Sequence, residues 1–109
     1  MSGIEFTAIR TTEQGFLCDY SAWDETVAQE LAGRIPLELT EAHWEIVHFI
    51  RGYYLRYRHL PNIRMFVKAV QKSLGDDKGN SRYLYRLFPD GPLKQACLVA
   101  GLPKPPSCL

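Results

Sequence analysis

Apolar side chains recur at helical spacing through most of this chain. From Ile63 onward, apolar residues follow three, four, seven and eleven positions later, which is one face of an α-helix. Comparable patterns predict five helices, at residues 22–33, 41–58, 63–74, 82–88 and 93–100. Ser21 and Thr40 are suitable N-caps for the first two helices, and Pro92 and Gly101 are expected to bound the last. The pattern therefore indicates a mainly helical protein.

The first twenty residues follow a different pattern. Residues 4–9 alternate apolar and polar side chains, and residues 16–20 do so again after a turn-forming segment at residues 11–15. Alternation with a period of two predicts an N-terminal β-hairpin. We therefore expect an α+β fold, mainly α, with a small N-terminal β-hairpin and five helices.

The last eight residues differ again, because three of them are prolines. Proline lacks a backbone N–H, so this segment is expected to be neither helix nor central strand. We predict a single globular domain at residues 1–100, followed by a flexible arm at residues 101–109 with Gly101 as its hinge. An extended arm of this length spans on the order of 20 Å. It carries Cys108 as the penultimate residue.

Length and composition narrow the class of protein. A chain of 109 residues, with 46% hydrophobic and 23% charged side chains, is enough for one core and is not typical of disorder. No apolar run reaches the roughly 18–20 residues of a membrane span. The N-terminus also lacks the basic and apolar regions of a signal peptide. We therefore expect a cytoplasmic protein that does not insert into membranes.

Charge is divided unevenly along the chain, although the total is only +1. Residues 1–50 hold nine acids and two bases, whereas residues 51–109 hold eleven bases and three acids. The base-rich half is suited to a negative partner or to the acidic half. The helices predicted at residues 41–58 and 63–74 also match a helix-turn-helix, so DNA binding is an alternative function. The low total charge argues against nucleic acid as the main partner.

Three cysteines are the candidates for chemistry. Cys108 lies on the predicted arm, from which a thiol reaches sites that a globular body cannot enter. Cys97 lies on the apolar face of the last predicted helix, either as a buried core thiol or as a partner for the returning arm. Cys18 is expected to pack within the hairpin. The cysteines lie at least eleven positions apart and lack the paired spacing of a zinc site, so we expect no metal.

Recognisable catalytic motifs are absent from the sequence. It has no Gly-rich phosphate loop, no Cys-His pair and no paired carboxylates in a recognisable context. His43, the third residue of its predicted helix, is interpreted as a surface or capping residue rather than a base. We expect no cofactor and no independent enzymatic activity.

Several runs of residues form a specific pattern. They are Lys78–Pro89, Gly91-Pro92, Lys94–Cys97 and Ala100–Pro105 with Cys108, and upstream His43–Glu45, Tyr54, Ile63-Arg64 and Val67–Ala69. On these residues the chain closely resembles the DsrC/TusE family. The resemblance implies a small sulfur carrier in which Cys108 holds persulfide sulfur. It also implies a fold in which a small β-hairpin or meander packs on an orthogonal array of about five helices, and sulfur exchange with sulfite reductase-type and sulfurtransferase-type proteins. We expect a protein co-substrate rather than a catalyst, monomeric when free.

The residue at position 97 divides this family. Members that resemble DsrC, partners of dissimilatory sulfite reductase, carry a cysteine there, whereas TusE-like relays in thiolation of the tRNA wobble uridine typically lack it. Cys97 therefore favours a DsrC-type carrier that cycles between Cys108 and Cys97 as a disulfide or trisulfide. A TusE-like relay is the alternative.

Four bases are candidates to support the thiol chemistry. Lys94, Lys104, Arg82 and Arg86 lie in the last third of the chain. Positive charge near a folded-back arm favours the Cys108 thiolate, whereas the adjacent carboxylate of Leu109 opposes it. Each of these bases is equally compatible with a solvated surface.

Overall fold

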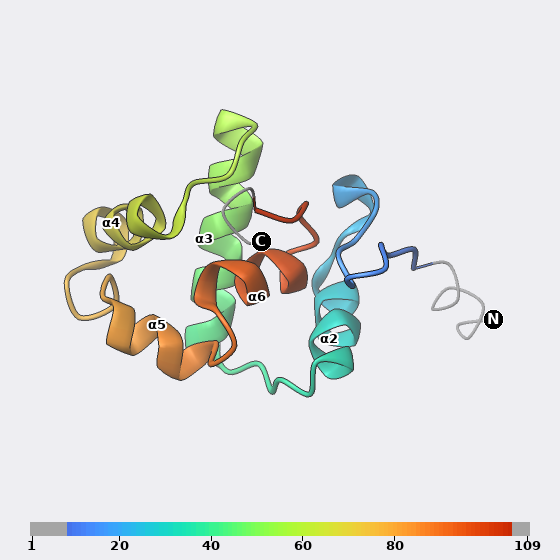
Figure 1. Cartoon of the computed structure of the whole chain (residues 1–109), viewed down its shortest axis with the longest axis horizontal. Coiled ribbons are helices and arrows are strands. Elements are labelled where there is room, and N and C mark those ends of the chain that lie inside the picture. Colours follow the sequence, from blue (N-terminus) through green and yellow to red (C-terminus); the bar gives the residue numbers. More distant parts are fainter. Residues whose placement is uncertain (1–8, 106–109) are drawn as a thin grey trace.

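The structure, a computed structural model, describes residues 9–105 (Figure 1). In this part of the chain a 3-10 turn, η1 (Tyr20–Ala22), precedes five helices: α2 (Glu25–Arg34), α3 (Glu41–Tyr57), α4 (Ile63–Leu74), α5 (Ser81–Leu87) and α6 (Pro92–Val99). Helix α6 lies at the centre, in contact with the other four. The prediction of a mainly helical fold with five helices is confirmed. No helix among these is long and apolar enough to cross a membrane.

Side-chain caps determine where three of the helices begin. Asp24, Asn62 and Asn80 each accept a hydrogen bond from a backbone N–H in the first turn of α2, α4 and α5. The predicted N-cap at Ser21 is wrong. Ser21 donates to the carboxylate of Asp19 through both its backbone N–H and its hydroxyl, which keeps it in η1. Helix α2 therefore begins at Glu25 rather than at residue 22.

The predicted N-terminal β-hairpin is not found in the described residues. There, strand-like pairing is limited to one antiparallel bridge between Thr11 and Leu17. Phe16 and Leu17 are both buried, so consecutive side chains point into the core instead of alternating between two faces. Residues 4–8 of the first predicted strand lie outside the described residues.

His43 is a buried cap that joins two helices. Its Nδ1 accepts the backbone N–H of Thr40 at 3.1 Å, and its Nε2 lies 2.6 Å from the carbonyl oxygen of Leu87. The tautomer with the proton on Nε2 satisfies both bonds, because a backbone N–H only donates and a carbonyl only accepts. The capping interpretation of His43 is confirmed. The surface interpretation is wrong, since only 6% of the residue is exposed.

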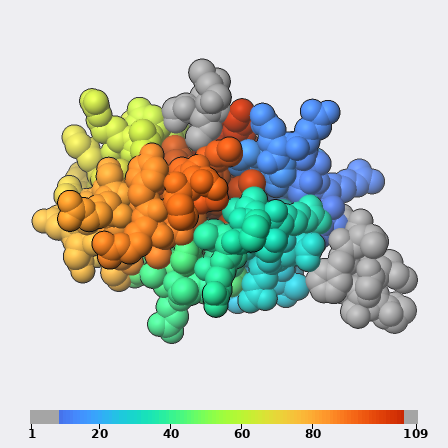
Figure 2. Space-filling view, turned by 60° about the horizontal axis from the view of Figure 1, so that its bottom comes forward, coloured from blue at the N-terminus to red at the C-terminus, as the bar shows by residue number. Residues whose placement is uncertain are grey.

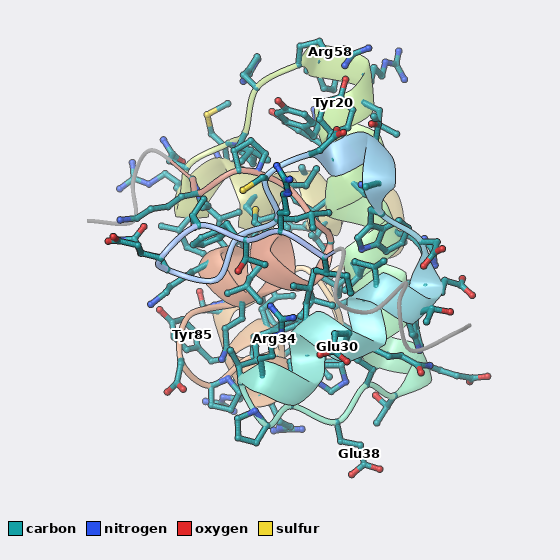
Figure 3. All side chains as sticks on the ribbon, turned by 90° about the vertical axis from the view of Figure 1, so that its right-hand side faces the viewer. Tyr20, Glu30, Arg34, Glu38, Arg58 and Tyr85 are labelled. Atoms are coloured by element: carbon teal, nitrogen blue, oxygen red, sulfur yellow. The ribbon has the colours of Figure 1, made fainter. Side chains whose placement is uncertain are left out.

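The acidic and basic halves of the sequence place helices at opposite ends of the fold. Helix α2, from the acidic half, and helices α4 and α5, from the basic half, lie toward opposite ends of the long axis (Figure 1). Among the described residues, the two halves are joined by one ion pair, in which Lys78 donates to Glu45 at 2.8 Å. This bond raises the pKa of Lys78. The other described pairs, such as Glu30 with Arg34 (Figure 3), stay within residues 1–50.

Candidate functional site at the end of helix α6

Helix α6 is enclosed by the rest of the protein. Seven of its eight residues are buried, and Lys94 is the exposed one. Cys97 is fully buried, with 0% of its surface exposed. In this conformation Cys97 is a core thiol, and a reagent reaches it only when the surrounding residues move.

A tight reversal ends α6. The N–H of Gly101 donates to the carbonyl of Leu98 at 3.2 Å, and the N–H of Leu102 donates to the carbonyl of Cys97 at 3.0 Å. These two bonds form a Schellman motif, which requires a left-handed residue at its corner. Gly101 occupies that corner with φ of 71°. The chain therefore reverses direction directly after the helix (Figure 1).

Two side chains from other parts of the fold hold this reversal. The indole Nε1 of Trp23 donates to the carbonyl of Val99 at 2.8 Å. Arg51, from α3, donates to the carbonyl of Ala100 at 3.0 Å and to that of Tyr20 at 2.8 Å. Its guanidinium also lies 4.4 Å from the centre of the Trp23 ring. The last carbonyls of α6 are thus bonded to an indole and to a cation, which is favourable at the negative end of a helix.

Arg51 is partly buried, and its guanidinium is turned toward the end of α6. Burial lowers the pKa of Arg51, while the nearby Tyr20 opposes this shift. Its guanidinium donates to two backbone carbonyls, so it is not available to the phosphates that the DNA-binding alternative requires. Arg58, the residue that follows α3, is also occupied, since it donates to the hydroxyl of Tyr20 (Figure 3).

The first part of the arm packs on the body of the protein. Leu102 and Pro105 are buried, and Pro103 is exposed. From Pro105 to Cys108 a fully extended chain covers at most about 10 Å. While Pro105 stays in place, the distance that Cys108 can reach is about half of what it would be if the whole arm swung from Gly101. Cys108 lies outside the described residues, so the division at residue 100 and the mobility of the arm stay predictions.

The four bases predicted to support the thiol lie on three different segments. Arg82 and Arg86 are exposed on α5, the orange surface of Figure 2, Lys94 is exposed on α6, and Lys104 is partly buried on the arm. None of them forms an ion pair within residues 9–105. Their effect on Cys108 stays a prediction.

Cys18 is exposed, so the prediction that it packs inside a hairpin is wrong. It lines a cavity of about 470 Å³ together with Arg10 and Asp19. Across residues 9–105, no three His, Cys, Asp or Glu side chains are placed to hold a metal ion. The contrast between exposed Cys18 and buried Cys97 makes Cys18 the natural control for experiments on thiols.

These features define a class of small helical protein. A central helix carries a buried cysteine. The tight reversal at its end, held by Trp23 and Arg51, leads into a proline-rich arm. Residues 4–109 match the family described as DsrC like protein. The chain belongs to this family, which confirms the resemblance seen in the sequence.

Relatives and solved structures cover nearly the whole chain. The Sulfurtransferase TusE of Sodalis glossinidius is 52% identical over 103 residues, which are 94% of this chain and 95% of the relative. The Sulfurtransferase TusE homolog of Haemophilus influenzae is 50% identical over 109 residues, which are 100% of this chain and 97% of that relative. The solution structure of Allochromatium vinosum DsrC has a TM-score of 0.83 at 52% identity, covering 91% of this chain and 88% of that one. The crystal structure of the oxidised γ-subunit of dissimilatory sulfite reductase (DsrC) from Archaeoglobus fulgidus has a TM-score of 0.79 at 47% identity. It covers 93% of this chain and 92% of that one.

Proposed function

We propose that this protein is a sulfur carrier of the TusE type, in which Cys108 receives sulfane sulfur from one protein and passes it toward tRNA thiolation. The observation that carries the proposal is the match over the whole chain to curated relatives named Sulfurtransferase TusE, at 50% identity or more. These relatives support the relay better than the dissimilatory role that Cys97 favoured in the sequence.

The transfer needs a thiolate and no bound cofactor. The Cys108 thiolate attacks the outer sulfur of a donor persulfide, forms a new S–S bond and displaces the donor thiolate, which then takes up a proton. No net oxidation occurs, because one S–S bond forms as another breaks. An acceptor thiolate repeats the same exchange on the Cys108 persulfide. The partners are therefore proteins that carry a persulfide or an accepting thiol.

The described part of the arm supports such a handover. The reversal at Gly101 is held by Trp23 and Arg51, so the root of the arm has a fixed position on the body. A short segment beyond Pro105 then carries the thiol, which limits the conformational entropy lost when it enters a partner.

The relay predicts a specific phenotype. In Haemophilus influenzae without its TusE homolog, this protein is expected to restore 2-thiouridine to tRNA, as measured by mass spectrometry of digested nucleosides. Cys108→Ser is expected to restore none, because a serine hydroxyl does not form a persulfide. Cys18→Ser is the matched control and is expected to restore it fully. The relay is wrong if wild-type protein, expressed and folded, leaves the thiouridine absent.

A second candidate is the DsrC-type carrier for sulfite reductase, which the presence of Cys97 favours. In that cycle Cys97 and Cys108 share a disulfide, whose formation gives two electrons and two protons to an oxidant. Reaching Cys97 requires the residues around it to shift, because Cys97 has no exposed surface.

Cys97 distinguishes the two candidates. Under the relay, Cys97→Ala is expected to restore thiouridine at close to the wild-type level, with a stability loss of about 1 kcal/mol for the lost sulfur contacts. Peptide mapping after treatment with diamide is expected to show no Cys97–Cys108 bond. A reversible Cys97–Cys108 disulfide, together with loss of thiouridine in Cys97→Ala, would favour the DsrC-type cycle instead.

A further inference from the structure

A groove between α3 and α4 combines aromatic and basic side chains that the sulfur chemistry does not use. It encloses about 440 Å³, and its lining includes Phe49, Tyr53, Tyr57, Arg56 and Lys72. Half of the surface of Tyr57 is exposed, and its ring lies 4.8 Å from that of Tyr53. Arg56 lies 5.4 Å from the centre of the Tyr57 ring. Exposed aromatic rings beside arginine are typical of protein contact sites.

Charge distinguishes this groove from two other cavities on the described surface. Asp19 and Asp24 line one of those cavities, and Glu41 and Glu45 line the other. The groove between α3 and α4 has two bases and no carboxylate in its lining. It is therefore the one of the three that suits a negatively charged occupant.

Helix α4 extends the positive charge beyond the groove. Arg64 and Lys68 are exposed and precede Lys72 at intervals of four residues, which places the three bases in one row along the helix. None of the three forms an ion pair within residues 9–105. The row is thus free of competing carboxylates in the described part of the chain.

The groove lies on the side of α3 that is turned away from α6. Val47 is fully buried, and Arg51 is bonded to the carbonyl of Ala100, so these two residues mark the side that faces α6. Arg56 follows Val47 by nine residues, or about two and a half turns at about 100° per residue, so it lies on the opposite side of the helix. An occupant of the groove therefore leaves the end of α6 and the root of the arm uncovered.

We infer that this groove docks an acidic segment of a partner protein, with one aliphatic or aromatic side chain inserted beside Tyr53 and Tyr57. Acidic side chains on either side pair with Arg56 and Lys72. A nucleic acid fits less well, because the net charge is only +1 and the acidic end at α2 offsets long-range attraction to a polyanion. The inference goes beyond sulfur transfer and does not require Cys108 to carry sulfur.

Amide chemical-shift mapping tests the surface directly. The probes are short peptides rich in Asp and Glu that carry one Leu, Phe or Trp, and the polar control has Ser at that position. Shifts are expected to concentrate on Gly52, Arg56 and Lys72, with at least one of the anchored peptides binding more tightly than the Ser peptide. The double variant Arg56→Glu/Lys72→Glu is expected to weaken binding by about tenfold or more, because two favourable charge contacts become repulsive.

A matched control separates the groove from overall charge. Arg10→Glu/Arg34→Glu changes the net charge by the same amount at exposed positions outside the groove, and it is expected to leave peptide binding within about twofold of wild type. If the groove variant fails to give a folded spectrum, Arg56→Gln/Lys72→Gln takes its place. The inference is overturned if none of the peptides with Leu, Phe or Trp shifts the amide signals of the groove residues, or if both double variants weaken binding equally. It is also overturned if oligouridine binds the groove more tightly than these peptides do.

Discussion

Incubation with a persulfide donor is expected to add one sulfur atom to the wild-type protein, and Cys108→Ser is expected to abolish that gain. The reason is chemical, since a thiolate attacks sulfane sulfur at neutral pH and an un-ionised hydroxyl does not. Serine is close to cysteine in size, so the body of the protein is expected to be undisturbed. Intact mass spectrometry without reductant measures the added sulfur directly.

The two other cysteines provide opposite controls for this experiment. Cys18 is exposed, so Cys18→Ser tests whether exposure alone leads to loading. Cys97 is fully buried, so it is expected to stay unloaded unless the residues around it move. Loading that persists in Cys108→Ser and disappears in Cys18→Ser would assign the carrier role to Cys18 and contradict the proposal.

The four helices from α3 to α6 were predictable because local signals and tertiary burial agree. Helix α4 begins and ends at the predicted residues, where Asn62 caps its start, Gly75 follows its end, and Phe66 and Val70 on its apolar face are fully buried. The start of α2 was less predictable. Asp19, Ser21 and Asp24 are all good caps, and which one begins a helix depends on the hydrogen bonds they make. Ser21 donates to Asp19, whereas Asp24 accepts the backbone N–H of Val27 and so begins α2.

The hydrogen bonds from Trp23 and Arg51 to the end of α6 were not predictable, because the residues they join are distant in sequence. The bond from Trp23 to Val99 joins residues 76 positions apart, and that from Arg51 to Ala100 joins residues 49 positions apart. In the sequence, Trp23 matches an ordinary apolar helix position and Arg51 belongs to a run of bases. The corner at Gly101 carried a signal, since a glycine after a helix indicates a left-handed end. That signal does not distinguish a fixed corner from a hinge.

Gly101→Ala is expected to lower the free energy of unfolding by roughly 2–4 kcal/mol, and with it the Tm by roughly 10–25 °C. Part of this loss comes from the φ of 71°, which residues other than glycine rarely adopt. The rest comes from contact, because a Cβ at Gly101 would lie 2.5 Å from Cδ1 of Trp23 and 2.9 Å from Cδ2 of Leu17. The Trp23 ring cannot turn away without losing its hydrogen bond to Val99. Thermal unfolding followed by circular dichroism measures the change.

Gly33→Ala is the matched control, because the same substitution there meets different surroundings. Gly33 lies inside α2, and a Cβ at that position has nothing within 4 Å. Alanine is the better helix former, so Gly33→Ala is expected to raise the free energy of unfolding by roughly 0.5–1 kcal/mol. If Gly101→Ala gives no folded protein, Trp23→Phe removes the donor to Val99 and is expected to cost roughly 1–3 kcal/mol. Equal Tm values for Gly101→Ala and wild type would show that the corner yields easily, and the arm would then swing from Gly101 rather than from beyond Pro105.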